Sequence, residues 1–574
     1  MAYSTADINS IDRAVSDKLR AFVKAEDCYP LVCVAHYAIN KNMTSESVEE
    51  IAHAAAEGSD DVEQLLLSVI APLSKDNMFE EAVDTVRGLD NDDVEAYLRY
   101  GTIPRNVFDT EASTPDGIAR LALEILDVED GDRVVDYGCG KGNFLEMAKA
   151  SHPTSNVIGV EANARTLALA EIRSKASESN IEYHMGDMFG FYEEHIAANP
   201  VDKAFSNYPW GIRTTHLQGT SRYIDDVLKG IGRYGRPSSA DWVFNQLLVD
   251  SLTPEGTAVA IMSNGACFNG TDRSVREYFV KNKFIEAIVA LPKGVFAPYT
   301  MIQTSLIVLR TGGSKGIRFV DASDLGVNDR RGSSLDDEAI EAILGRLSED
   351  SEKSAVKSIE EIASRDFDLS AKRYLEKEIK VPNAVNLGSV CDIIRGASVR
   401  AADLDALVCD EDTGMSYLNL GNIADGSIDE DLPNLRELDS KLERYCIEDG
   451  DVLVSKNGAP FKVAVADVPE GRKILANGNL YMVRVDREKI DPYYLAAFLS
   501  SPMGKELLAR EAVGTTIPNV PVRALAALQI PLEDENRQKS IASAYLAKTD
   551  EIKVLKLRLQ RAQKEVADLF DEEA

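Results

Sequence analysis

The chain has 574 residues, and 63 lysines and arginines against 95 aspartates and glutamates give it a formal net charge of −32. This balance excludes a uniformly basic nucleic-acid coat, although a large acidic protein can still carry a local basic cleft whose binding weakens with salt. Hydrophobic residues make up 44% and charged residues 28% of the sequence, which argues against wholesale disorder and predicts several domains with buried cores.

The 7 cysteines are scattered, without a CxxC pair or a His/Cys cluster of zinc spacing. We therefore expect reduced thiols in a cytoplasmic protein, and no metal site. The first residues, MAYSTADINSIDRAVSDKLR, carry charges instead of an apolar signal segment, and no uninterrupted apolar stretch reaches the length of about 18 residues needed to span a membrane. We expect a protein that is neither secreted nor inserted in a membrane.

Three regions follow one another over the first 380 residues. Residues 1–110 show helical apolar periodicity with acidic exposed faces, which predicts a helical N-terminal domain. In 111–325, short β-branched runs such as DRVVDYG, NVIGVEA and TSLIVLR alternate with helical segments, which predicts a parallel α/β sheet. Residues 326–380 are rich in charge, and we expect a connector with a helix in it.

Residues 381–532 change to short strands punctuated by Gly, Asn and Asp, which predicts a β-rich domain. Residues 533–574 return to a long helix whose apolar side chains recur at spacings of three and four, and such a heptad seam favours a partner helix. A helix packed on its own domain is the alternative, because the run is short. The seam residues are Ile552, Leu555, Leu559, Ala562, Val566 and Leu569.

Glycines in YGCGKGNFL lie at the predicted turn between a strand and a helix. Gly138, Gly140 and Gly142 would let the backbone approach a ligand closely, next to the unpaired amides of a helix N-terminus. The loop differs from the G-x-G-x-x-G of dinucleotide-binding proteins, and Asp136 precedes it at the end of the strand.

Two further acids follow the next predicted strands. Glu161 ends the second strand, where a carboxylate can accept both hydroxyls of a ribose, and Asp187 follows the third, within reach of an adenine amino group. Acids at three successive strand ends fit S-adenosylmethionine better than a nucleotide, because a cationic sulfonium needs no lysine-rich phosphate cradle.

The fourth strand ends in the sequence Asn-Tyr-Pro-Trp. The exocyclic amine of adenine is a poor nucleophile until its nitrogen pyramidalises, and two acceptors promote this: the amide oxygen of Asn207 and the backbone carbonyl of Tyr208, fixed by Pro209. Trp210 would stack on a base taken out of the duplex. The simpler alternative is an ordinary turn that ends a strand.

In order and spacing, residues 107–322 resemble the M subunits of type I restriction-modification systems, which are DNA N6-adenine methyltransferases. The resemblance rests on STPDGIARLALEIL, DYGCGKGNFL, GVEAN, NYPW and LPKGVFAPYTMIQTSLIVLR. It implies a Rossmann-like S-adenosylmethionine-dependent methyltransferase domain over 111–325, double-stranded DNA as substrate, and contact of Thr114 and Pro115 with the methionine end of the cofactor. Tyr208 replaces the first proline of the family's Asn-Pro-Pro motif, where we expect it to add bulk beside the target base, and Ser113 replaces an aromatic residue.

Residues 386–573 resemble half of a type I specificity (S) subunit, through NLGSVCDIIRGAS, GDVLVSKNGAP and GTTIPNVPVRALAALQIPL followed by the long helix. S subunits carry two target-recognition domains and two helical spacers. The resemblance therefore implies an M subunit fused to one α+β target-recognition domain, 381–532, and one coiled-coil-type spacer, 533–574. Candidate DNA contacts, or alternatively ordinary solvated charges, are Arg395, Arg400, Lys456, Asn457, Lys462, Arg472 and Lys473.

One recognition domain reads one half-site, so we expect a homodimer through antiparallel C-terminal helices that reads two inverted half-sites separated by unspecified bases. A separate restriction subunit is a further expected partner, because no nuclease motif stands out in the N-terminal domain and no helicase P-loop stands out either. Two other hypotheses compete with DNA methylation. One is a methyltransferase that acts on RNA or on a protein amide, and the other is a catalytically silent DNA-binding or assembly protein that kept the fold.

Overall fold

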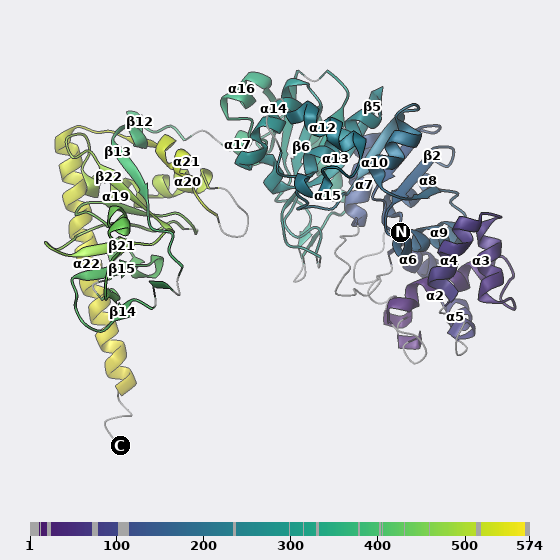
Figure 1. Ribbon diagram of the computed structural model, residues 1–574, viewed down its shortest axis with the longest axis horizontal. Helices are drawn as coiled ribbons and strands as arrows, with labels where there is room; N and C mark the ends of the chain where they lie inside the picture. Colours follow the sequence, from purple (N-terminus) through teal and green to yellow (C-terminus); the bar gives the residue numbers. More distant parts are fainter. Residues whose placement is uncertain are drawn as a thin grey trace. The chain divides into compact units, whose positions relative to one another are not determined.

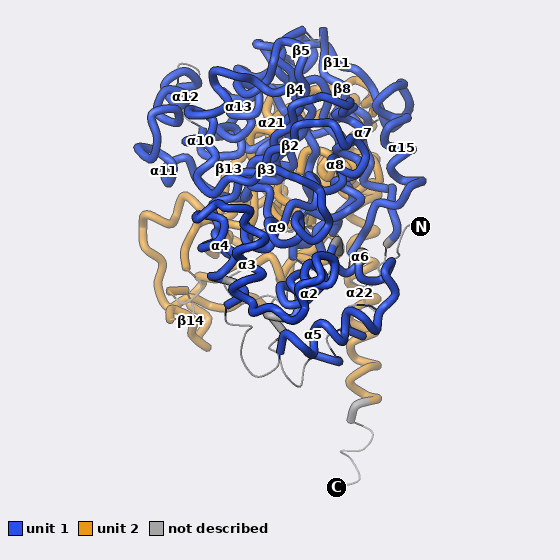
Figure 2. Tube along the Cα trace, turned by 90° about the vertical axis from the view of Figure 1, so that its right-hand side faces the viewer, with its two compact units in different colours: residues 1–376 blue, residues 377–574 orange. Residues whose placement is uncertain are grey.

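The computed structural model divides into two compact units, Met1–Glu376 and Lys377–Ala574 (Figures 1 and 2). Each unit has its own core and is described by itself. The residues that the structure describes are 11, 13–15, 17–19, 25–71, 78–100, 114–232, 237–297, 299–313, 315–328, 332–376, 379–400, 403–404, 406–429, 431–458, 460–512 and 518–568. None of the helices in these ranges is both long enough and apolar enough to cross a membrane.

The N-terminal region of the first unit is helical where it is described. Local signals set the helix ends: Ser47 caps the second of these helices in a reciprocal capping box with Glu50. The apolar faces share one core with four side chains of a later helix, α9 (Ala164–Ser177), on which α2 and α4 pack. The N-terminal helices are α2 (Ala25–Asn40), α3 (Val48–Ala56), α4 (Asp60–Ile70), α5 (Met78–Arg87) and α6 (Asn91–Tyr100).

A nine-stranded sheet forms the centre of this unit, in the order β11-β8-β6-β7-β5-β4-β1-β2-β3. Most of its strands are continuous apolar runs, because helices cover both faces. The strands are β1 (Arg133–Tyr137), β2 (Asn156–Glu161), β3 (Glu182–Met185), β4 (Val201–Ser206), β5 (Leu252–Ser263), β6 (Ile285–Ala290), β7 (Thr304–Arg310), β8 (Gly316–Asp321) and β11 (Ser354–Ser358).

The sheet is mixed, so the expectation of a purely parallel sheet is wrong. β1 to β5 run parallel, but β7 runs antiparallel to both β5 and β6, and β11 runs antiparallel to β8. A parallel pair needs a crossover, usually a helix, and the described residues between β6 and β7 form only turns and extended chain.

Helices on the two faces enclose two separate cores. One face is covered by α7 (Asp116–Leu126), α8 (Asn143–Ser151) and α15 (Asp337–Ser348). The other face carries α10 (Met188–Phe191), α12 (Arg222–Gly232), α13 (Asp241–Ser251), α14 (Arg273–Lys281), α16 (Ile359–Ser364) and α17 (Ala371–Leu375), with the short α11 (Thr214–Leu217) between α10 and α12. The strand order reverses between β1 and β4. In open α/β sheets, ligands bind at such a switch point, outside the carboxyl ends of the strands, and we call this region the crevice.

The segment that we expected to be a connector, 326–380, instead builds much of one edge of the unit. It contributes a small hairpin of β9 (Val327–Asn328) and β10 (Ser333–Ser334), the covering helix α15, and β11, which pairs with β8 from Ser354↔Val320 to Ser358↔Gly316. An edge strand exposes one face, so its sequence, Ser-Ala-Val-Lys-Ser, lacks the long apolar run of a central strand.

The second unit is β-rich. It contains sheets in the orders β13-β22-β19-β20 and β14-β18-β15-β21, and the pairs β12-β23 and β16-β17. Its strands are β12 (Ala384–Asn386), β13 (Cys391–Arg395), β14 (Val408–Cys409), β15 (Met415–Leu418), β16 (Ile423–Ala424), β17 (Ser427–Ile428), β18 (Asn434–Leu435), β19 (Val452–Ser455), β20 (Val463–Val465), β21 (Lys473–Ala476), β22 (Leu480–Val485) and β23 (Gln529–Pro531). Its shorter helices are α19 (Pro492–Ser500), α20 (Pro502–Arg510) and α21 (Val522–Ala527).

The long helix α22 (Glu535–Asp568) has two different halves. Its first half packs on α19, with Ala542 buried and Ile541 and Tyr545 against the same core. In the second half the seam is bare: Leu555, Leu559 and Val566 are 54%, 58% and 66% exposed, and Ile552 and Ala562 are exposed as well. Leu569 lies outside the described residues. Packing on its own domain therefore accounts for the first half of the helix alone.

Candidate active site

The glycine loop lies between β1 and α8, on the carboxyl side of the sheet. Gly138, Gly140 and Gly142 all have positive φ angles, of 76°, 56° and 76°. A Cβ atom at Gly142 would overlap the buried hydroxyl of Tyr183, so only glycine fits there. The tight turn leaves the first amides of α8 directed at the crevice.

Glu161, at the end of β2, is 5% exposed and fastens this loop. Its Oε2 accepts a hydrogen bond from the amide of Gly140 at 3.0 Å, and its Oε1 accepts one from the amide of Asn163 at 2.7 Å. A carboxylate oxygen can accept a second hydrogen bond, so Glu161 combines a structural role with the capacity to bind a pair of hydroxyls.

Asp136, at the end of β1, is 2% exposed, and its Oδ1 has no hydrogen-bond partner among the described residues. Burial, together with the nearby charge of Glu161, raises the pKa of Asp136 well above its usual value. An orphaned buried carboxylate oxygen beside a glycine loop fits a ligand that brings a positive charge or a donor.

Asp187 occupies the third acid position, after β3. It caps α10, where its Oδ2 accepts a hydrogen bond from the amide of Gly190 at 3.0 Å, and the side chain is exposed. Lys141 does not form a phosphate cradle in the loop, because its Nζ lies 5.0 Å from the ring centroid of Tyr29 in the N-terminal helices. Acceptors therefore dominate this part of the crevice.

Thr114 and Pro115 directly precede α7, and Thr114 joins the two halves of the site. Asn207, after β4, donates from Nδ2 to the Thr114 hydroxyl at 3.2 Å. Asn143, the first residue of α8, donates to the Thr114 carbonyl, also at 3.2 Å. The Thr-Pro segment therefore ties the glycine loop to the Asn-Tyr-Pro-Trp loop, and residues far apart in the sequence form one site.

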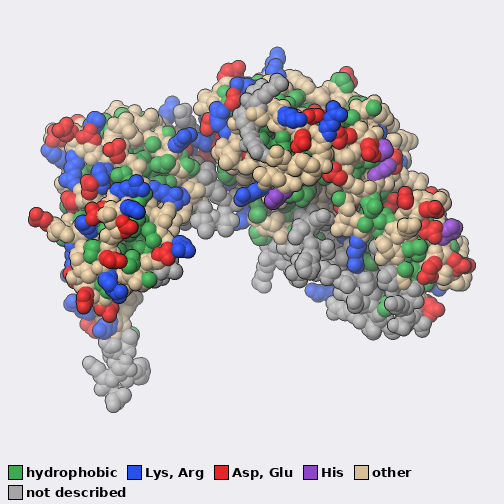
Figure 3. All heavy atoms as spheres, in the orientation of Figure 1, with side chains coloured by type: hydrophobic (Ala, Val, Ile, Leu, Met, Phe, Trp, Pro, Cys, Tyr) green, Lys and Arg blue, Asp and Glu red, His purple; other side chains and the backbone are tan. Residues whose placement is uncertain are grey.

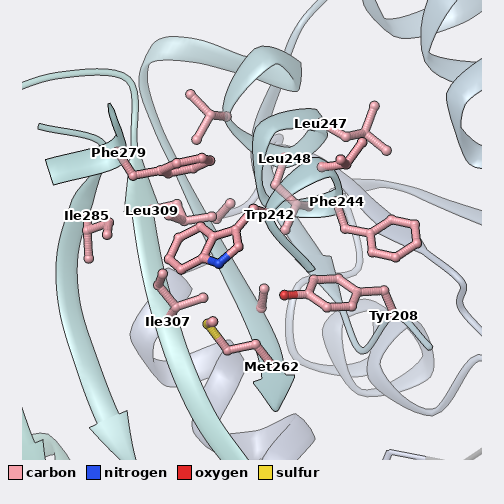
Figure 4. Packing of buried hydrophobic residues seen from close by; sticks show 14 of the residues in the cluster. Tyr208, Trp242, Phe244, Leu247, Leu248, Met262, Phe279, Ile285, Ile307 and Leu309 are labelled. Carbon is pink, nitrogen blue, oxygen red and sulfur yellow. The ribbon is translucent and has the colours of Figure 1, made fainter. Parts of the chain in front are cut away.

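The side chain of Tyr208 lies in the core and not beside the site, which overturns our expectation of added bulk next to a target base. It is 1% exposed, its hydroxyl donates to Asn245 Oδ1 at 3.0 Å, and its ring stacks on Phe244 with centroids 4.8 Å apart. Figure 4 shows it among Phe244, Trp242 and Met262. Only the backbone of Tyr208 belongs to the loop.

Pro209 is exposed and Trp210 is half-buried. The indole Nε1 of Trp210 donates to the carbonyl of Ile261 at 3.0 Å, and its ring meets Phe296 edge-on with centroids 4.8 Å apart. The indole is therefore held in a fixed orientation at the carboxyl edge of the sheet, as a stacking platform requires.

Arg173 is a site residue that the sequence analysis missed. It lies on α9, is 2% exposed, and donates to the carbonyl of Lys141 at 3.0 Å and to Asn143 Oδ1 at 2.9 Å. It thereby holds both the glycine loop and the residue that binds Thr114. Arg173 is one of two arginines in an alanine-rich helix, and no spacing signal could have identified it.

In the second unit, the candidate DNA contacts separate into two groups. Four of the cations are engaged within the unit: Arg400 with Asp403 at 2.9 Å, Arg472 with Asp412, Lys473 with Glu443 at 2.7 Å, and Lys462 with the carbonyl of Leu420 at 2.9 Å. The other candidates, Arg395, Lys456 and Asn457, meet around one turn, residues 477–480.

Comparisons with known proteins show what part of this chain is similar to. Residues 109–381 match the family model of the N-6 DNA Methylases. The chain is 28% identical over 338 residues to the methylase subunit of the type I restriction enzyme MjaVIII of Methanocaldococcus jannaschii, covering 54% of this chain and 57% of that protein. It is 25% identical over 335 residues to the MpnII methylase subunit of Mycoplasma pneumoniae, covering 54% and 61%. The chain thus spans less than two thirds of the length of these relatives.

Two solved structures share the fold. One is the methyltransferase subunit of a type I restriction-modification system from Streptococcus thermophilus, with a TM-score of 0.50, 18% identity, and coverage of 65% of this chain and all of that one. The other is the DrdV–DNA complex, with a TM-score of 0.50, 12% identity, and coverage of 95% of this chain and 69% of that one. The family match and the relatives support a relationship of residues 109–381 to type I methylase subunits.

Proposed function

We propose that this protein is a sequence-specific DNA methyltransferase of a restriction-modification system, which transfers a methyl group from S-adenosylmethionine to N6 of adenine in double-stranded DNA. The observation that carries the proposal is the hydrogen bond from Asn207 to Thr114. It fixes the loop that would hold the target amine against the segment next to the glycine loop, where the cofactor would bind.

The residues of the crevice fit S-adenosylmethionine. Glu161 would bind the ribose hydroxyls, Asp187 the adenine amino group, and the orphaned Oδ1 of Asp136 the positively charged methionine end near Thr114 and Pro115. When bound, the cofactor supplies an electrophilic methyl group on a sulfonium. The chain supplies the acceptors, and two of them, Asp136 and Glu161, are buried, where a hydrogen bond is worth more than in bulk water.

The loop after β4 would hold the target adenine. The amide of Asn207, oriented through its Nδ2, presents Oδ1 as one acceptor for the N6 protons, and the backbone carbonyl of Tyr208 is the second. Trp210 would stack on the extruded base. Because the Tyr208 side chain points into the core, it leaves room for the base, and this supports an active enzyme over the catalytically silent reading.

The second unit would act as a target-recognition domain with one spacer helix, fused behind the methyltransferase unit as half of an S subunit. The bare seam on the second half of α22 supports a homodimer through antiparallel helices. Two recognition domains would then read two inverted half-sites, separated by a number of unspecified bases that the helix length sets. DNA cleavage would require a separate restriction subunit.

The test is methyl transfer by the full chain. With labelled S-adenosylmethionine and DNA that lacks this methylation, label should appear in N6-methyladenine, and Asn207→Ala should abolish it. Asn282→Ala, at an exposed asparagine after α14, is the matched control and should keep full activity. Label in RNA or protein would favour the alternative substrates, and no transfer despite bound cofactor and DNA would favour a silent protein.

A further inference from the structure

The second unit brings two cations together at the end of β13 and β19. Arg395, the last residue of β13, is exposed and donates from Nε to the carbonyl of Gly478 at 3.1 Å. Lys456, directly after β19, donates its backbone amide to the carbonyl of Asn479 at 2.7 Å. Both residues are therefore anchored to the same turn between β21 and β22.

The backbone around Lys456 is held by a second segment. The carbonyl of Lys456 accepts the amide of Val520 at 3.0 Å, and the amide of Gly458 donates to the carbonyl of Pro518 at 2.9 Å. Asn457 donates from Nδ2 to Asn479 Oδ1 at 3.0 Å. The loop at 456–458 is thus held from two sides, so little conformational entropy would be lost when a ligand binds there.

The charges of this pair differ from those of Arg472 and Lys473, two other candidate DNA contacts of the unit. Over the described residues, neither Arg395 nor Lys456 forms an ion pair, whereas Arg472 and Lys473 are neutralised by acids at the rim of another sheet. Burial and the charge of Arg395 lower the pKa of Lys456, so the two cations disfavour one another in the free protein. Figure 3 shows many Lys and Arg side chains on the visible face of this unit, mixed with acids.

We propose that Arg395 and Lys456 form a binding site for one phosphate group of the DNA backbone. The inference deepens the proposed function and rests on it. An anion between the two side chains would turn their mutual repulsion into two charge-assisted hydrogen bonds. A phosphate accepts from both cations at once, and such a contact fixes the register of the recognition domain on the duplex without reading sequence.

The matching test measures how DNA affinity depends on salt. The full chain, Arg395→Ala, Lys456→Ala and the double variant would be titrated with a fluorescent DNA duplex of mixed sequence, and with a duplex that carries the methylated site, over a range of salt concentrations. Arg472→Ala and Lys473→Ala are the matched controls, since each removes a cation of the same unit that is already paired.

Each site variant should bind both duplexes less tightly by a similar factor, and the slope of log affinity against log salt should fall by about one for each lost contact. The controls should keep the parental slope. Because Arg395 is exposed and Lys456 half-buried, all variants should keep the parental circular dichroism spectrum and melting temperature.

Three outcomes would overturn the phosphate site. Parental slopes in Arg395→Ala and Lys456→Ala would show that no phosphate is neutralised there. A loss confined to the methylated sequence would show a base contact instead. Equal losses in the two controls would show a diffuse charge effect. Failure of the unaltered chain to bind or methylate any DNA would instead overturn the proposed function, and the phosphate site with it.

Discussion

Asn207 and Thr114 are 93 positions apart, and the amide of Asn207 donates to the hydroxyl of Thr114 at 3.2 Å. The carbonyl of the same threonine accepts from Asn143 on the glycine-loop helix. One residue thus links the loop that would hold the target base to the loop that would hold the methyl donor. An error in the Thr114 position would misalign the two reactants, which catalysis tolerates poorly.

This link predicts a specific kinetic effect for Thr114→Val. The substitution keeps the shape of the side chain but removes the acceptor for Asn207, so the rate of methyl transfer should fall by up to about tenfold, the value of one neutral hydrogen bond. The affinity for S-adenosylmethionine should change less. Thr114→Ser keeps the hydroxyl and should retain the parental rate. Single-turnover rates and calorimetric titration would separate the two effects, and equal losses in both variants would contradict the role of the hydroxyl.

Glu161→Ala should weaken S-adenosylmethionine binding. The substitution removes the acceptors for the ribose hydroxyls and also releases the amides of Gly140 and Asn163, at a cost of about 1–3 kcal/mol. Calorimetric titration would measure the loss of affinity for S-adenosylmethionine. Glu182→Ala, at the exposed start of the neighbouring strand, is the control and should bind the cofactor normally. A parental affinity in Glu161→Ala would remove Glu161 from the site.

Asp136 should make the stability of the cofactor-free protein depend on pH. Its pKa is raised in the folded state, so its contribution to stability is fully present below the usual aspartate pKa of about 4 and is lost as the pH rises through the raised value.

Asp136→Asn imitates the protonated form. It should therefore be more stable than the parent at neutral pH without cofactor, and this advantage should vanish in acid. The same variant should bind S-adenosylmethionine more weakly, because the positive methionine end loses its carboxylate. Melting temperatures at several pH values, with and without cofactor, would test both points. An identical pH dependence in variant and parent would contradict the assignment.

Tyr208→Phe should reduce stability more than activity. It leaves Asn245 Oδ1 buried without the Tyr208 donor, which costs about 1–3 kcal/mol, while the backbone carbonyl of residue 208 stays in the loop. Tyr208→Pro, which restores the proline usual in the resembled motif, would empty the volume of a buried ring and cost about 3–5 kcal/mol. Denaturant unfolding and initial rates would measure these effects. Methyl transfer abolished in a folded Tyr208→Phe would contradict the core position.

Leu559→Glu should convert a dimer into a monomer. It places a charge in the exposed seam of α22, where the partner helix would bury it. Lys564→Glu lies on the opposite side of the heptad and should leave the dimer intact. Light scattering in the presence of DNA would show the assembly, and methylome sequencing should find two inverted half-sites. A monomeric parent, or a single contiguous asymmetric motif, would leave α22 as a dock for another protein.

The sequence predicted which residues lie close together better than it predicted the directions of their side chains. Glycines and acids at strand ends are local signals, and the structure places Asp136, Glu161 and the glycine loop in contact or close together. The direction in which a side chain points beyond the end of a strand depends on tertiary packing, and the local sequence does not determine it. Tyr208 lies two positions after Ser206, and both side chains are buried on the same side of the chain. Only the packing of the core shows that the ring of Tyr208 points away from the loop.

Tertiary partners explain what the sequence could not predict. The role of Arg173 depends on the carbonyl of Lys141 and the amide oxygen of Asn143, which lie 32 and 30 positions away, and no sequence periodicity records such contacts. The edge strand β11 could not be predicted for a related reason. Its polar residues give no strand pattern in the sequence, and it forms a strand because it pairs with β8. Long-range hydrogen bonds, and not composition, decided both cases.

The shared core between the N-terminal helices and α9 has a consequence for how the first unit unfolds. α9 buries Leu169 and Ile172 against α2 and α4, and from the same helix Arg173 holds the glycine loop. If the N-terminal helices unfolded, α9 would lose the residues that pack on it, and the glycine loop that Arg173 holds would be released at the same time. The helical region is thus a cooperative part of the fold that holds the glycine loop, and a ligand bound at the loop would also stabilise the N-terminal helices.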